Sequence, residues 1–170
     1  MNAPSGIKMV ILDVDGVLTN GAIIMDDLGQ ESKLFHARDG LGIYMLHSAG
    51  VRVALLSGRR AEVVEHRARQ LKIEEVYQEV YDKVPVYEKI LEKNGLGDEE
   101  ICYMGDDLID LPVMRRAGYS AAPSDAHPLV REAARMVTRA RGGQGAVREV
   151  IEALLKASGA WKTVMEQFDR

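Results

Sequence analysis

The chain has 170 residues, of which 46% are hydrophobic and 28% are charged, and its formal net charge is -4. This balance predicts one globular domain over residues 1–170 with a sizeable core, and it gives no electrostatic reason to expect nucleic acid or an anionic membrane as a partner. The single cysteine, Cys102, excludes an internal disulfide and favours a reducing compartment. No apolar run approaches the roughly 18 residues of a membrane span, and Met1–Lys8 does not resemble a secretory signal, so we expect a cytoplasmic protein.

The first third of the chain predicts a buried strand, a hairpin and a helix. Met9–Asp13 is a continuous apolar run that ends in an acid, as expected for a strand buried on both faces. Two β-type runs, Ala22–Met25 and Leu34–Phe35, flank a turn-like segment. They predict a β-hairpin over about 20–36 that projects from the end of the first strand. A helix is expected over Asp39–Ser48, with its first residue as the cap.

Short apolar runs alternate with longer helical patterns through the rest of the chain. The expected strands are Val51–Leu56, Val76–Val80, Ile101–Met104, Tyr119–Ala122 and Met136–Val137. The expected helices are Arg60–Leu71, Val84–Lys93, Leu108–Ala117, Pro128–Ala134 and Val147–Leu155. This alternation is typical of an α/β fold, and it predicts a Rossmann-like three-layer αβα sandwich with a central parallel sheet. The glycine-rich Arg139–Gly145 is expected to be a loop, and residues 156–170 a C-terminal tail.

Polar residues follow four of the predicted strands, at the edge where open parallel sheets bind ligands. Asp13 and Asp15 straddle the end of the first strand. Ser57-Gly58-Arg59 leads from the second core strand into a helix, where backbone amides suit an anion. Lys83 precedes the next helix, and Asp106-Asp107-Leu108-Ile109-Asp110 follows the strand after it. The sequence therefore predicts one site that combines acids, a hydroxyl group and a cation.

In this order, the four groups of residues resemble the motifs of the haloacid dehalogenase superfamily of phosphohydrolases, and the match runs from about Val10 to Asp110. The resemblance implies an aspartyl-phosphate intermediate and Mg2+ as cofactor. It implies that Asp13 is the nucleophile and a metal ligand. Asp15 would protonate the leaving alkoxide, later activate water, and offer its backbone carbonyl to the metal. Asp106 is the main further ligand in the same resemblance.

The other motif residues have supporting roles in this resemblance. Ser57 and Lys83 would hold the phosphoryl oxygens, and Asp110 would position Lys83. Asp107 would support the acidic cluster, although capping of the following helix explains it equally well. Phosphate monoesters hydrolyse extremely slowly without a catalyst. A carboxylate nucleophile divides the displacement into two steps, and Mg2+, which prefers oxygen ligands, brings the two anions together.

The superfamily usually selects substrates with a cap domain, and this chain has no room for one. Only about 20 residues separate Thr19 from Asp39, which is enough for the hairpin alone. In capless relatives a neighbouring subunit closes the site. The resemblance therefore implies a homo-oligomer, and we expect a homotetramer whose hairpins shape neighbouring sites.

Further segments narrow the resemblance to phosphatases of 2-keto-3-deoxy sugar acids. They include Asp39–Ile43, Asp125–Pro128 and Arg141–Val150. This likeness implies a phosphorylated sugar acid as substrate, namely an eight-carbon sugar-acid 8-phosphate whose free acid is used in lipopolysaccharide synthesis.

Five residues are candidates for substrate binding, namely Thr19, Gly58, Arg59, Arg60 and Gly143. Guanidinium groups match the geometry of carboxylates, so Arg59 and Arg60 are candidates for the anionic or hydroxyl portion of the substrate. Arg60 could instead face solvent. Gly143 belongs to a glycine-rich segment that either closes over a site or serves as a plain linker.

Two alternatives stay open from the sequence. Closely similar domains act on nine-carbon 2-keto-3-deoxy sugar-acid 9-phosphates. A non-catalytic oligomerisation module is the other alternative, and it is disfavoured because the chain keeps every expected acid. Two segments depart from the pattern of relatives: Tyr77–Asp82 lacks a glycine-containing turn, and the tail after Gly159 has no assigned counterpart.

Overall fold

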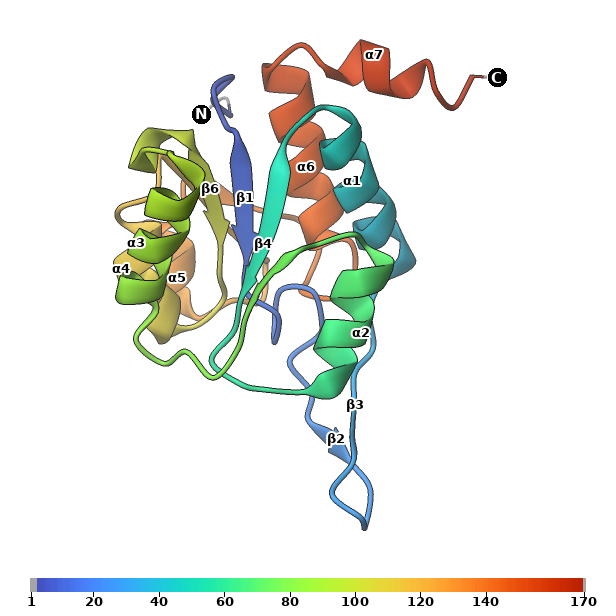
Figure 1. The fold of residues 1–170 in the computed structure, drawn as a ribbon, viewed down its shortest axis with the longest axis vertical. Coiled ribbons are helices and arrows are strands. Elements are labelled where there is room, and N and C mark those ends of the chain that lie inside the picture. Colours follow the sequence, from blue (N-terminus) through green and yellow to red (C-terminus); the bar gives the residue numbers. More distant parts are fainter. Residues whose placement is uncertain (1–2, 170) are drawn as a thin grey trace.

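A parallel sheet of six strands forms the centre of the structure, which is a computed structural model that describes residues 3–169 (Figure 1). The strands lie in the order β5-β4-β1-β6-β7-β8. They are β1 (Met9–Leu12), β4 (Arg52–Leu56), β5 (Glu75–Tyr77), β6 (Ile101–Met104), β7 (Tyr119–Ala122) and β8 (Met136–Val137). The helices are α1 (Ala37–Ser48), α2 (Glu62–Gln70), α3 (Lys83–Asn94), α4 (Leu111–Met114), α5 (Pro128–Ala133), α6 (Ala146–Ala157) and α7 (Trp161–Met165). An antiparallel pair, β2 (Ile24–Met25) and β3 (Glu31–Ser32), forms a separate hairpin.

Alternate residues of β1 face the two sides of the sheet. Val10 and Leu12 belong to a core that includes side chains of α1, α2 and α6, whereas Met9 and Ile11 belong to a core that includes side chains of α3, α4 and α5. All four are fully buried, as a central strand packed on both faces requires. One layer of helices therefore covers each face, and the predicted three-layer α/β sandwich is confirmed (Figure 1).

The strand order creates a crevice beside β1. From β1 the chain extends the sheet through β4 and β5 on one side, and then through β6, β7 and β8 on the other. Ligands of open parallel sheets bind where this direction reverses, outside the carboxyl ends of the strands. The hairpin projects from that same edge (Figure 1). Among the residues that the structure describes, it is the only regular structure between β1 and α1.

The predicted hairpin forms, but the prediction of its second strand is wrong. Ile24–Met25 pairs with Glu31–Ser32 and not with Leu34–Phe35. The turn sets this register, because the carboxylate of Asp26 accepts hydrogen bonds from two backbone N–H groups of the turn. Gly29 completes the turn with a positive φ of 75°.

Asp39 does not cap α1, contrary to the prediction. The helix begins at Ala37, and the side chain of His36 caps it. The Asp39 carboxylate instead accepts hydrogen bonds from the backbone N–H groups of Gly145 (3.3 Å) and Arg148 (2.8 Å) at the start of α6. An acid of one helix thereby satisfies the unpaired N–H groups of another. This contact fixes the end of the glycine-rich loop.

Two other predicted elements differ clearly in extent from the structure, and a short helix forms in the predicted C-terminal tail. The helix predicted over Leu108–Ala117 begins as a 3-10 turn at Leu108–Asp110, and α4 then ends at Met114. The strand predicted at Val76–Val80 is shorter, because the backbone turns at Glu79 with a positive φ of 59°. The short helix α7 follows no clear periodic pattern and is held by Val164, which is buried in the core. Within residues 3–169, no helix combines the length and apolar character needed to cross a membrane.

Candidate active site

A cavity of about 240 Å³ lies at the carboxyl edge of the sheet. Its lining comes from the loops that follow β1, β4 and β6. The lining residues are Asp13, Asp15, Gly21, Ser57, Gly58, Arg59, Asp106, Asp107 and Ile109. A larger hollow of about 880 Å³ lies next to the start of β7, and its described lining residues include no acid. The acidic groups of the predicted site therefore gather at the smaller cavity.

Asp13 follows β1 directly and is only 6% exposed. Its backbone N–H donates to the carbonyl of Met104 (3.0 Å), which continues the pairing of β1 with β6. Its carboxylate Oδ1 accepts a hydrogen bond from Nζ of Lys83 (2.9 Å). Burial raises the pKa of Asp13 to about 6, although the neighbouring Lys83 ammonium opposes the shift.

Lys83 is the first residue of α3, and its side chain has no exposed surface. Besides Asp13, its Nζ donates to Oδ1 of Asp110 (2.7 Å) and to the hydroxyl of Tyr103 (3.2 Å). Burial alone would lower the pKa of Lys83, but the two carboxylates raise it above its ordinary value. A lasting positive charge therefore lies beside the Asp13 carboxylate.

Asp110 accepts hydrogen bonds with both of its carboxylate oxygens. Oδ1 accepts from Lys83 and from the hydroxyl of Tyr103 (2.6 Å). Oδ2 accepts from the backbone N–H groups of Asp106 (3.0 Å) and Asp107 (3.1 Å). Each carboxylate oxygen offers about two acceptor positions, so all of them are occupied. Asp110 thus fixes its neighbours and has no acceptor left for an external ligand.

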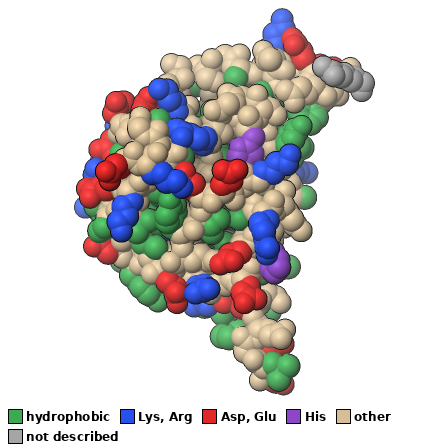
Figure 2. Space-filling view, in the orientation of Figure 1, with side chains coloured by type: hydrophobic (Ala, Val, Ile, Leu, Met, Phe, Trp, Pro, Cys, Tyr) green, Lys and Arg blue, Asp and Glu red, His purple; other side chains and the backbone are tan. Residues whose placement is uncertain are grey.

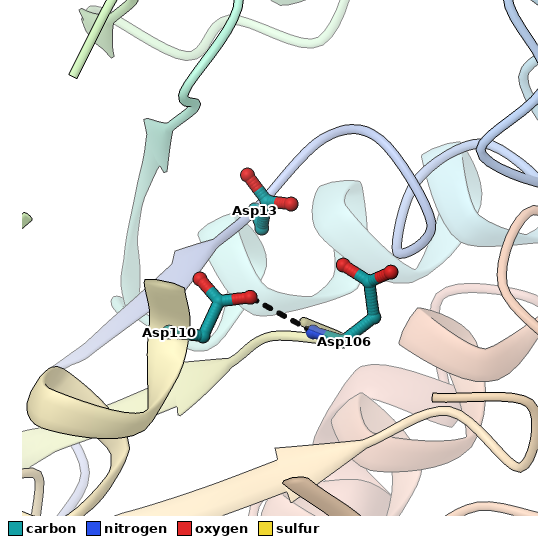
Figure 3. Close-up of side chains that lie close together, drawn as sticks. All are labelled: Asp13, Asp106 and Asp110. Carbon is teal, nitrogen blue, oxygen red and sulfur yellow. Dashed lines mark hydrogen bonds between the residues drawn. The ribbon is translucent and has the colours of Figure 1, made fainter. Parts of the chain in front are cut away.

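Asp106 differs from Asp110 because one of its carboxylate oxygens accepts no hydrogen bond from the described residues. Carboxylate oxygens of Asp13, Asp106 and Asp110 lie within 4.8 Å of one another, where Asp13 follows β1, Asp106 follows β6 and Asp110 ends the 3-10 turn (Figure 3). Oδ1 of Asp106 is buried and has no hydrogen-bond partner among residues 3–169. Burial, together with the charge of Asp13, raises the pKa of Asp106 to about 8. Asp13 and Asp106 therefore form a pair of oxygen donors of the kind that hard cations such as Mg2+ prefer.

Two glycines allow the loops of the site to approach this closely. Gly16 has a positive φ of 90°, and a Cβ at this position would lie 2.0 Å from Oδ2 of Asp106. A Cβ on Gly142 would lie 1.8 Å from the carbonyl oxygen of Gly16. A side chain at Gly16 would displace the Asp106 carboxylate, and one at Gly142 would displace the loop that carries Asp15. The glycine-rich segment therefore packs directly against the loop after β1.

An ion-pair network joins Asp15 to the hairpin. Oδ1 of Asp15 accepts a hydrogen bond from Nζ of Lys33 (2.5 Å), which also donates to Oε1 of Glu31 (2.7 Å). Oε2 of Glu31 accepts from Nη2 of Arg59 (3.1 Å). The hydrogen bond from Lys33 is the main cause that lowers the pKa of Glu31. The network thus connects the loop after β1, the hairpin and the loop after β4.

Three residues of these networks carry no functional signal in the sequence. Glu31 and Lys33 lie in a segment that is typical of a polar hairpin, and Tyr103 lies in an apolar run typical of a buried strand. Only their contacts in the folded chain connect them with the predicted acids.

The structure brings most of the predicted site residues to the cavity. Ser57 and Gly58 line it, and so does Asp107, whose carboxylate also caps the 3-10 turn through the N–H of Leu108 (2.7 Å). Arg60 is not in the lining, and its side chain is 63% exposed with only a distant contact to Glu79 (3.8 Å).

Thr19 and Gly143 also lie outside the cavity lining. The Thr19 hydroxyl donates to the carbonyl of Val14 (3.3 Å), and the Gly143 N–H donates to the carbonyl of Val17 (3.0 Å). Both residues therefore shape the loop after β1 from within the protein.

The chain is similar in sequence and fold to known phosphatases. A family model of haloacid dehalogenase-like hydrolases matches residues 72–151. The 3-deoxy-D-manno-octulosonate 8-phosphate phosphatase KdsC of Escherichia coli (strain B / BL21-DE3) is 46% identical over 159 residues, which cover 94% of this chain and 85% of that protein. The Moraxella catarrhalis 3-deoxy-D-manno-octulosonate 8-phosphate phosphatase, solved in complex with a magnesium ion, a phosphate ion and KDO, has a TM-score of 0.94 at 35% identity and covers 96% of this chain and 94% of its own. The cobalt-bound form of the Haemophilus influenzae deoxy-D-mannose-octulosonate 8-phosphate phosphatase has a TM-score of 0.90 at 39% identity, with 94% and 93% covered.

Proposed function

This chain belongs to the haloacid dehalogenase-like hydrolases, and we propose that it is a Mg2+-dependent phosphatase of 3-deoxy-D-manno-octulosonate 8-phosphate. Its products would be phosphate and the free eight-carbon sugar acid, which serves lipopolysaccharide precursor synthesis. The observation that carries the proposal is the buried carboxylate of Asp13, which Lys83 holds beside Asp106 at the carboxyl edge of the sheet.

Mg2+ fits the donors that the site offers. Asp13 and Asp106, with the backbone carbonyl of Asp15, would hold the ion. Oδ1 of Asp106 is buried without a hydrogen-bond partner among the described residues, and burial raises the pKa values of Asp13 and Asp106, so a cation between them would favour their charged forms. When bound, the ion would neutralise the charge of the attacking carboxylate and of the phosphoryl group.

Asp13 is the proposed nucleophile, and Asp15 the proposed acid and base. A carboxylate oxygen of Asp13 forms a bond to phosphorus while the bond from phosphorus to the ester oxygen breaks, which yields an aspartyl-phosphate and an alkoxide. Asp15 gives its proton to that alkoxide, and then takes a proton from the water that attacks phosphorus. This second attack releases phosphate and restores the Asp13 carboxylate.

Ser57 and Lys83 are the proposed groups for the phosphoryl oxygens. The hydroxyl of Ser57 accepts a hydrogen bond from the N–H of Arg59 (3.3 Å) and can still donate one to a ligand. The three N–H donors of Lys83 already have partners, so this residue contributes mainly a fixed positive charge. Such preorganised charge stabilises a transferring phosphoryl group.

Arg59 is the proposed contact for the carboxylate of the sugar acid. It lines the cavity, 41% of its side chain is exposed, and Nη2 of its guanidinium group donates a hydrogen bond to Glu31. Gly58 would let the substrate approach the backbone beside it. Thr19 and Gly143 would influence binding indirectly through the loop after β1, and the exposed position of Arg60 gives it at most a peripheral contact.

The proposed functional unit is a cytoplasmic homotetramer in which residues 1–170 of each chain form one catalytic domain. The support for assembly is the hairpin, which stands out from the body of the protein with apolar side chains at its surface (Figure 2). These exposed side chains are Ile23, Ile24, Met25, Leu28 and Leu34. A group of exposed apolar side chains on a projecting element is typical of a subunit interface.

Phosphate release by the purified protein with Mg2+ tests the proposal. The eight-carbon 8-phosphate and a nine-carbon 9-phosphate are compared in parallel, and the solution mass is measured on the same sample. We expect kcat/KM to be at least about tenfold higher for the eight-carbon ester, and no turnover by a folded Asp13→Asn variant. Little preference between the esters would contradict the proposed substrate. A complete lack of turnover would favour the non-catalytic module, and activity of Asp13→Asn would contradict the proposed nucleophile.

A further inference from the structure

A buried lysine of the hairpin contacts Asp15, and the proposed reaction assigns it no role. Lys33 directly follows β3, next to residues 20–30, all of which are exposed. Its side chain is nevertheless only 1% exposed. Nζ lies 2.5 Å from Oδ1 of Asp15 and 2.7 Å from Oε1 of Glu31.

These two contacts define what the ammonium group of Lys33 can do. A buried ammonium is unfavourable unless carboxylates or other acceptors surround it, and Lys33 has one carboxylate from the hairpin and one from the loop after β1. It is not among the residues that line the cavity. Lys33 is therefore a bridge between two segments of the chain, and its side chain is not placed to bind the substrate directly.

The same contacts make the two oxygens of Asp15 unequal. Oδ1 is held by Lys33, whereas Oδ2 is buried and has no hydrogen-bond partner in the part of the chain that the structure describes. Nε of Arg59 lies 3.8 Å from Oδ2, which is too far for a hydrogen bond. Asp15 itself lines the cavity together with Asp13 and Asp106. One oxygen is thus anchored, and the other is left for a ligand.

We propose that Lys33 is a positioning residue, which anchors Oδ1 of Asp15 so that Oδ2 is correctly placed for both proton transfers. The inference rests on the proposed function, because it requires Asp15 to act as acid and base. Proton transfer needs heavy atoms within hydrogen-bond distance, and a displacement of about 1 Å lowers a rate on the order of 100-fold. Among residues 3–169, Lys33 provides the only hydrogen bond to the Asp15 carboxylate, so its loss frees that side chain to rotate.

A double-mutant cycle between Lys33 and Asp15 tests this inference. The variants are Lys33→Met, Asp15→Asn and the double variant, each assayed with Mg2+ on the eight-carbon ester and on nitrophenyl phosphate, whose leaving group needs no proton. We expect Lys33→Met to lower kcat on the sugar ester about 10- to 100-fold with KM within about threefold. In the Asp15→Asn background the same change should alter kcat less than about twofold, because the group that Lys33 positions is already disabled.

Two control variants separate positioning from a general effect on the fold. Lys33→Arg keeps the charge and the donors, and it should recover about tenfold or more of the lost kcat. Lys89→Met, on the exposed side of α3, should behave like the wild-type protein. If Lys33→Met does not fold, Lys33→Gln carries the same test, since it removes the charge but can still donate one hydrogen bond.

The possible outcomes distinguish the inference from the function on which it rests. A kcat of Lys33→Met within about twofold of wild type, or losses that multiply in the double variant, would overturn the positioning role while the proposed function stands. A wild-type protein that hydrolyses no ester would overturn both.

Discussion

Two buried lysines hold the two aspartates that follow β1, and they come from different regions of the molecule. Lys83 begins α3 inside the body of the protein, and its partners Asp13, Tyr103 and Asp110 are buried as well. Lys33 comes from the hairpin, next to a stretch that is exposed throughout. Asp13, the proposed nucleophile, is therefore fixed by the core, whereas Asp15, the proposed acid and base, is fixed by the hairpin.

This difference indicates which contacts of the site would depend on assembly in the proposed homotetramer. The position of Asp13 follows from the sheet, since its N–H continues the pairing of β1 with β6. The position of Asp15 depends on where the hairpin lies, because Lys33 and the neighbouring Glu31 belong to it. In the proposed tetramer, contacts between hairpins would therefore affect proton transfer by Asp15 more than attack by Asp13.

Lys83→Met should cause the largest loss of activity and stability among the variants that compare the core with the hairpin. Asp13 and Asp110 would stay buried without their cation, which costs about 3 kcal/mol of unfolding free energy. Loss of the fixed charge beside the phosphoryl group should lower kcat/KM by a factor on the order of 1000. Phosphate release and urea unfolding at neutral pH measure both effects.

Lys33→Met in the same urea experiment shows whether the two regions differ as described. The side chains of Asp15 and Glu31 are 19% and 13% exposed, so water can partly replace the lost ammonium. We expect its unfolding free energy to fall by about 1–2 kcal/mol, less than for Lys83→Met, whose partners are more deeply buried. Equal losses of stability for the two lysine variants would contradict the distinction between the core and the hairpin.

The sheet-edge part of the site is largely predictable from sequence, for a physical reason. A strand packed on both faces gives a continuous apolar run, and the polar residue after the run marks its carboxyl end. Asp13, Ser57 and Asp106 are located in this way. Parallel pairing then brings them to one edge, whatever the order of the strands. The resemblance to a family assigned roles to these residues, and the structure shows that they share one cavity.

The hairpin contacts are not predictable by the same reasoning. Lys33 meets Asp15 across 18 residues of sequence, and this contact depends on where the turn closes. The second hairpin strand was predicted at Leu34–Phe35, three residues beyond its position at Glu31–Ser32. An odd shift moves each side chain to the opposite face of a strand. Neither Glu31 nor Lys33 could therefore be assigned to the cavity side in advance.

Gly142→Ala should have an intermediate effect, because it disturbs Asp15 from the body of the protein and leaves the hairpin contacts of Lys33 unchanged in sequence. The new Cβ would overlap the carbonyl of Gly16, so the loop that carries Asp15 must move. We expect kcat/KM to fall about 10- to 100-fold and the unfolding free energy to fall by about 2 kcal/mol. Kinetics and urea unfolding measure both.

Two other glycines serve as references for that variant. A Cβ on Gly29, at the tip of the hairpin, meets no atom within 4 Å, so Gly29→Ala should cost only the strain of its positive φ, about 1 kcal/mol. Gly6 has neither a positive φ nor a neighbour within 4 Å, so Gly6→Ala should change neither kcat/KM nor the unfolding free energy. If Gly142→Ala lowered kcat/KM and the unfolding free energy no more than Gly29→Ala does, the close packing against the loop after β1 would not contribute to activity.

The pH dependence of stability tests the same comparison, because it has opposite signs in the two regions. Without a bound cation, the pKa values of Asp13 and Asp106 are raised to about 6 and about 8. The folded chain then binds these protons more tightly than the unfolded chain, so the stability they contribute is complete below about pH 4 and is lost as the pH rises through those values. The pKa of Glu31 is lowered, so its contribution is present above its ordinary pKa and is lost as the pH falls.

Mg2+ should therefore stabilise the protein more at about pH 8 than at about pH 5.5, where protons already neutralise Asp106 and most of the charge at Asp13. A large excess of Mg2+ should raise the thermal midpoint by about 5–10 °C at the higher pH and by less than half as much at the lower. Asp106→Asn should remove most of this shift, whereas Glu31→Gln in the hairpin should leave it unchanged. A shift that is independent of pH, or that survives in Asp106→Asn, would mean that Lys83 alone balances the sheet-edge acids, and the cation would then have to bind elsewhere.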